Sequence, residues 1–85
     1  MDEIKIKITQ LLYSLGFTEQ KKIISNEEFA EIFRVIDSLN LINFVVGLEN
    51  TFGIEMPDEF LLPENFNSVD DLSEYIALML LIEPE

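Results

Sequence analysis

A serine at the start of an amphipathic segment is the residue of this sequence that is best placed for chemistry. Ser38 follows Asp37, which can itself cap a helix beginning there, so the Ser38 hydroxyl is less needed as a cap. A helix N-terminus favours an attached phosphate, because it offers unbonded N–H groups and a partial positive charge. With no base near it in sequence, the hydroxyl looks like a substrate for another enzyme. A serine here is also a common cap, so position alone leaves both roles open.

The residue types that are missing narrow the function classes. The chain has no Cys and no His, which removes disulfides, thiolate metal sites and the commonest general base near neutral pH. No Asp-x-Asp-x-Asp-Gly loop for calcium is present. We therefore expect neither a metal site nor an enzyme, although chemistry by carboxylates alone is not ruled out by composition.

The charge is strongly acidic and unevenly distributed. Seventeen acidic and five basic residues give a formal net charge of −12, and the last cation along the chain is Arg34. The remainder of the chain carries eleven carboxylates, which would repel nucleic acid and attract basic protein surfaces. A simple role in solubility is the alternative explanation of the charge.

Apolar spacing predicts an all-α fold, a small four-helix bundle with three longer helices and one short helix. We expect a single domain over residues 1–85, because the chain is too short for two. Residues 17–37 are expected to form a long connection that contains only a short turn around Phe29. The expected helices are 3–15, 38–52 and one that follows a cap at Ser68, with a short helical piece at 58–62.

The termini and apolar runs indicate where the protein works. The charged start of the chain is unlike a signal peptide, and the longest apolar run, Ile76 to Ile82, is too short to span a membrane. We expect a cytoplasmic monomer.

In the last helix we expect one buried face, made of Val69, Leu72, Ile76, Met79 and Leu80.

The segment 38–52 carries two apolar stripes rather than one. The first stripe, enough to meet a small core, is Leu41, Phe44, Val45, Leu48 and Phe52. A second stripe of Leu39, Ile42 and Val46 is flanked by Asn43 and Glu49. Either this helix is central and buries both stripes, or the second stripe meets another protein.

The ordered set of residues around and after Ser38 resembles the acyl carrier protein family, including its peptidyl and D-alanyl carrier relatives. The similarity covers about residues 29–80, with Phe29 near the place of a buried Phe in the family. The residues that carry it are Asp37-Ser38-Leu39, then Leu48-Glu49, Phe52-Gly53-Ile54-Glu55-Met56-Pro57-Asp58-Glu59 and Leu62-Pro63-Glu64-Asn65-Phe66-Asn67-Ser68-Val69, followed by Leu72 and Ile76.

This resemblance implies a function. Ser38, next to Asp37, would accept 4′-phosphopantetheine from coenzyme A through a separate Mg-dependent phosphopantetheinyl transferase, and the thiol of that arm would carry an acyl group as a thioester. The helix after the serine would be the partner-recognition helix, which a loading ligase and downstream synthase enzymes would contact. Its candidate contacts are Leu39, Ile42, Asn43, Val46 and Glu49. Members of the family often shelter an acyl chain between helices.

Two departures from the family pattern point to a specialised member. The usual Leu-Gly-x-Asp-Ser entry is replaced by Phe33-Arg34-Val35-Ile36-Asp37-Ser38, and asparagines stand where fatty-acid carriers often have carboxylates in the recognition helix. We expect a dedicated carrier of a polyketide, nonribosomal peptide or lipid pathway. The alternative is an acidic helical adaptor without a prosthetic group, which would explain the charge and the stripe but gives the Asp-Ser-Leu motif no role.

Overall fold

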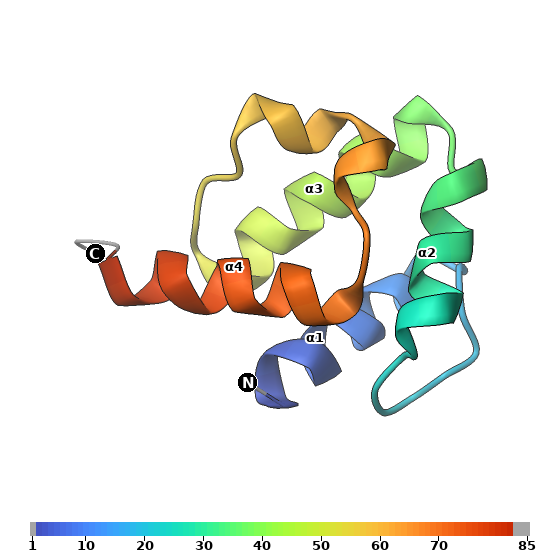
Figure 1. The fold of residues 1–85 in the computed structure, drawn as a ribbon, viewed down its shortest axis with the longest axis horizontal. Coiled ribbons are helices and arrows are strands. Elements are labelled where there is room, and N and C mark those ends of the chain that lie inside the picture. The colour runs from blue at the N-terminus through green and yellow to red at the C-terminus, as the bar shows by residue number, and fades with distance from the viewer. Residues whose placement is uncertain (1, 83–85) are drawn as a thin grey trace.

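The computed structural model describes residues 2–82, and within this range the chain is helical without a strand (Figure 1). The elements are α1 (Asp2–Ser14), α2 (Asn26–Val35), α3 (Ser38–Phe52), η1 (Asp58–Leu61), η2 (Pro63–Asn65) and α4 (Val69–Ile82), where η denotes a 3-10 helix. α1 packs against α3 and α4, and α2 stands across one end of this group. The prediction of an all-α bundle with four helices is confirmed.

Helix α1 holds the connection that follows it. The side chains of Ile8 and Leu12 are fully buried, and Gly16 ends the segment with a φ of 87°, a left-handed conformation that suits glycine. The Thr9 hydroxyl donates to the Lys5 carbonyl and accepts from the Ile24 N–H, both at 2.9 Å. The loop before α2 is thus fixed to the middle of α1.

The prediction of a long connection over residues 17–37 is wrong, because α2 forms a complete helix of ten residues within it. Ser25 caps the helix, its hydroxyl accepting from the Glu28 N–H at 3.1 Å. Phe29 and Phe33, one turn apart on the same face, are buried. Capping and the burial of these two rings stabilise the helix.

Helix α3 buries one of its two apolar stripes and exposes the other. Leu41, Phe44 and Leu48 are at most 1% exposed, and Phe52 is half-buried against the same core. Leu39, Ile42 and Val46 are exposed. The alternative in which α3 is central and buries both stripes is therefore wrong.

The chain returns from α3 to α4 through two 3-10 helices, where the sequence had predicted a single helical piece over 58–62. Pro57 precedes η1 and Pro63 begins η2, so the prolines separate two short turns. In α4, the buried face of Val69, Leu72 and Ile76 is confirmed, but Leu80 is 43% exposed. The prediction of a buried Leu80 is wrong because the last turns of α4 extend past the rest of the bundle (Figure 1).

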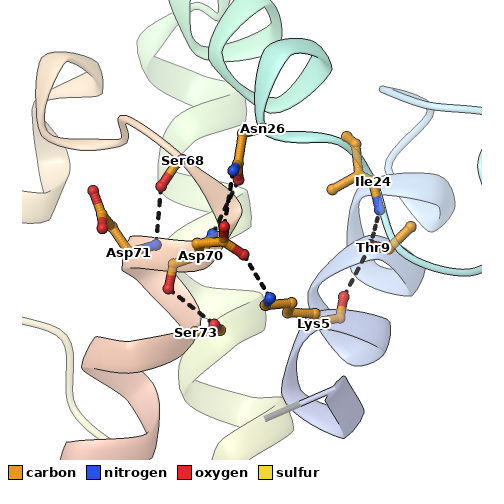
Figure 2. Close-up of polar contacts among 8 residues, drawn as sticks. All are labelled: Lys5, Thr9, Ile24, Asn26, Ser68, Asp70, Asp71 and Ser73. Atoms are coloured by element: carbon orange, nitrogen blue, oxygen red, sulfur yellow. Dashed lines mark hydrogen bonds and ion pairs between the residues drawn. The ribbon is translucent and has the colours of Figure 1, made fainter.

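A group of polar side chains, here called the polar junction, joins three helices at the start of α4 (Figure 2). It consists of Lys5 on α1, Asn26 on α2 and Asp70 on α4. The Asp70 carboxylate accepts from Asn26 Nδ2 at 2.9 Å and pairs with the Lys5 ammonium, while the Asp70 N–H donates to Asn26 Oδ1 at 3.1 Å. The junction therefore fixes the N-terminal end of α2 to α1 and α4.

Candidate functional site

The first position of α3 presents a hydroxyl that the fold does not use. Asp37 is the N-cap of the helix, and its Oδ1 accepts from the Asn40 N–H at 2.9 Å. The Asp37 carbonyl accepts from the Leu41 N–H at the same distance. Ser38 is exposed, and its hydroxyl makes no hydrogen bond within residues 2–82. Asp37 therefore caps the helix, and the Ser38 hydroxyl stays exposed without a partner in the described residues.

The electrostatic surroundings of Ser38 suit a group that carries a phosphate. The N–H groups of the first turn point toward the start of the helix, and the helix dipole adds a partial positive charge there. Of the four α-helices, α3 is the one without an acidic side chain in its first turn, whereas α1, α2 and α4 each have two. A phosphodiester on the Ser38 oxygen therefore meets no carboxylate from within that turn, and the neighbouring carboxylate, that of Asp37, is engaged by the Asn40 N–H.

An exposed apolar stripe runs along α3 from this serine. Leu39 is 68% exposed, and Ile42 and Val46 are each 45% exposed. Asn43, which the sequence predicted as part of the same surface, is exposed between them. The structure thus places four of the five expected partner contacts on one solvent-facing side of α3, next to Ser38.

The fifth expected contact, Glu49, has a second role. Its side chain is half-buried, and its Oε2 accepts from the Met56 N–H at 2.9 Å. This hydrogen bond holds the turn after α3 against the helix. Glu49 therefore offers a partner only part of its carboxylate.

Three further apolar side chains that sequence reasoning missed are exposed outside α3. Val35, the last residue of α2, is 81% exposed, and Leu61 and Leu62 at the end of η1 are 42% and 50% exposed. Val35 stands two residues before Asp37, so its position in the altered entry sequence was a usable signal. Leu61 and Leu62 had none, because a 3-10 turn between two prolines has no periodicity that separates exposed from buried residues.

Comparison with known proteins identifies the family. The family described as "Phosphopantetheine attachment site" matches residues 22–76, a range that runs from before α2 into α4 and includes Ser38. This chain belongs to the acyl carrier protein family. The cofactor of this carrier is 4′-phosphopantetheine, and carriers of this family hold a group for other proteins without catalysing a reaction themselves. They work with transferases and synthases.

Two curated relatives are similar over most of the carrier. The acyl carrier protein of Thermosynechococcus vestitus is 30% identical over 74 residues, covering 87% of this chain and 88% of the relative. The acyl carrier protein homolog of Mycoplasma genitalium is 38% identical over 73 residues, covering 82% and 80%. No solved structure matches the chain. No helix within residues 2–82 is long and apolar enough to cross a membrane.

Proposed function

We propose that this carrier holds an acyl or aminoacyl thioester on 4′-phosphopantetheine attached to Ser38 and presents it to partner enzymes of a specialised polyketide, nonribosomal peptide or lipid pathway. The observation that carries the proposal is the exposed hydroxyl at the first position of α3, which Asp37 relieves of the capping role. The thiol of the bound arm supplies the thioester chemistry, which the chain itself lacks because it has no Cys.

In the attachment step, Ser38 supplies the nucleophilic hydroxyl, and the base comes from another protein. The Ser38 oxygen attacks the phosphorus of coenzyme A that bears the pantetheine, forming an Oγ–P bond while the P–O bond to the second phosphate breaks. The hydroxyl proton passes to a base, and adenosine 3′,5′-bisphosphate leaves. The chain has no His, so we assign that base, together with the Mg²⁺, to the separate phosphopantetheinyl transferase. Asp37 contributes by fixing the start of α3.

Partner enzymes are proposed to contact the solvent-facing side of α3 beside the arm. Leu39, Ile42 and Val46 supply apolar area, Asn43 supplies a neutral polar group, and Glu49 supplies the one carboxylate within the helix. Because the helix is poor in charge, apolar contact should select the partners more than ion pairing does. This surface fits a monomeric carrier with a dedicated loading ligase better than one shared with general fatty-acid synthase enzymes.

A mass measurement tests the attachment. The protein is incubated with coenzyme A, Mg²⁺ and a broad-specificity phosphopantetheinyl transferase, and the expected result is a mass gain of one phosphopantetheine. Ser38→Ala should abolish the gain. Ser25→Ala is the matched control, because Ser25 is also exposed at a helix start but caps it, and this variant should still be modified. A folded wild-type protein of unchanged mass would favour the acidic adaptor instead.

A loading assay tests the pathway. The holo-protein is offered to general fatty-acid synthase enzymes and, in parallel, to acyl- or aminoacyl-activating ligases encoded beside its own gene. We expect efficient loading by one of those ligases and poor loading by the general enzymes. Efficient loading by the general enzymes, with none by a neighbouring ligase, would contradict a specialised pathway while leaving the attachment at Ser38 intact.

A further inference from the structure

Six aromatic side chains form one connected group, here called the aromatic network, which fills the interior on the side of α2 and the 3-10 helices. Its members are Phe29, Phe33, Phe44, Phe60, Phe66 and Tyr75. Neighbouring rings have centroids 4.6–6.4 Å apart. Four members, Phe29, Phe33, Phe44 and Phe66, are at most 4% exposed. Rings at these separations are in close contact, so an alkyl chain cannot pass between them without displacing them.

Two of these rings stand at the end of the bundle where Ser38 lies. Phe33 is in the last turn of α2, which leads through only two residues into α3, and its ring lies 5.2 Å from that of Phe44 inside α3. Phe66, which follows η2, stacks on Phe33 at 4.6 Å with an angle of 19° between the rings. The stack therefore bridges α2 and the 3-10 segment across the buried face of α3.

A hollow that is partly open to solvent lies beside Phe66. It has a volume of about 210 Å³ and is lined on its apolar side by Phe60, Phe66, Leu72 and Tyr75. Phe66 thus stacks on Phe33 and also lines the hollow. An acyl chain that crossed the interior from the Ser38 end of the bundle to this hollow would have to displace Phe33 or Phe66.

We propose that the stacked Phe33 and Phe66 rings close the interior of this carrier to its cargo, so that it carries acyl groups of a few carbons or aminoacyl groups, which remain in solvent, rather than long alkyl chains. This inference rests on the proposed function, because it assumes that the arm is attached at Ser38. Phe33 is then a specificity-determining residue. Truncating it should leave an apolar cavity among Phe29, Phe44 and Phe66, since apolar cavities left by core truncations stay empty and bind apolar groups.

Cleavage of the thioester by hydroxylamine tests this inference. Acetyl and octanoyl arms are attached to wild type and to Phe33→Ala from the corresponding acyl coenzymes A, and each rate is divided by that of the free acyl-pantetheine. In wild type the two normalised rates should agree within about twofold. In Phe33→Ala the octanoyl rate should fall about tenfold relative to the acetyl rate, because a chain sheltered for about nine-tenths of the time reacts only in the remaining tenth.

Control variants separate the effect of Phe33 on the acyl chain from the attachment of the arm at Ser38. Phe52→Ala removes a half-buried ring outside the aromatic network and should leave the octanoyl rate as in wild type. If Phe33→Ala does not fold by circular dichroism, Phe33→Leu should show smaller protection in the same direction. A protected octanoyl thioester in wild type, or an unprotected one in a folded Phe33 variant, would overturn the inference alone. A missing mass gain on loading would overturn the proposed function as well.

Discussion

At the scale of single residues, the site depends on the different roles of Asp37 and Ser38. Asp37 satisfies the helix start, and this leaves Ser38 unbonded and exposed. Removing the cap in Asp37→Ala should lower stability by about 1 kcal/mol, which lowers the Tm of a domain of this size by about 4–8 °C. Thermal unfolding followed by circular dichroism measures it. Asp37→Asn, which can accept the same hydrogen bond, should stay close to wild type, and an equal loss in both variants would contradict the capping role.

Asp70 should make stability depend on pH in the acid range. The hydrogen bond from Asn26 and then that from Lys5 hold the pKa of this carboxyl below its usual value of 3.8. Its stabilising contribution is therefore complete above that value and is lost as the pH falls through the lower folded-state pKa. In urea unfolding, the stability difference between wild type and Asp70→Asn should be constant near neutral pH and shrink below pH 3.8.

The matched control for that experiment is Asp71→Asn. It removes a carboxylate from the same turn of α4, but from a side chain that takes no part in the polar junction. The difference in stability between this variant and wild type should not shrink in the same way below pH 3.8. If both variants lose their difference together, the effect reflects net charge rather than the contacts of Asp70 with Asn26 and Lys5.

At the scale of elements, sequence patterns located what local chemistry decides and missed what packing decides. The cap at Asp37 and the two apolar stripes of α3 could be predicted from the sequence, because each depends on residues within one helix, whereas which stripe is buried depends on packing. For the segment that forms α2, the sequence predicts only a short turn. The stability of α2 comes from Phe29 and Phe33, whose ring partner Phe66 lies more than thirty residues away.

The end of α3 gives a test of backbone geometry. Gly53 has a φ of 68°, and its N–H donates to the Glu49 carbonyl at 2.8 Å. A Cβ added there would meet no atom within 4 Å, so the cost of Gly53→Ala is that of the left-handed backbone alone. Denaturant unfolding should show a loss of about 1 kcal/mol. Gly53→Asn should lose less, because Asn tolerates this conformation better, and an unchanged Gly53→Ala would mean that the helix ends elsewhere.

At the scale of the whole molecule, charge separates the chain into two unlike parts. All five cations lie within the first 34 residues, and eleven of the seventeen carboxylates follow. Lys5 is paired with Asp70, and Lys7 and Lys21 lie over the rings of Phe52 and Tyr13. Within residues 2–82, Lys5–Asp70 is the one ion pair. Most carboxylates therefore have no cation beside them, and the compact state brings them closer to one another than the unfolded chain does.

This repulsion should make the carrier more stable at higher ionic strength. Raising sodium chloride from about 20 mM to about 500 mM shortens the Debye length severalfold, so the Tm should increase, and millimolar Mg²⁺ should increase it further. The same screening weakens the partly exposed Lys5–Asp70 pair, but one such pair contributes little against many repulsive contacts. The double variant Glu55→Gln, Glu64→Gln removes two exposed carboxylates and should respond less to salt than wild type. If the Tm does not change with ionic strength, the carboxylates are too far apart in the folded chain for their repulsion to oppose folding.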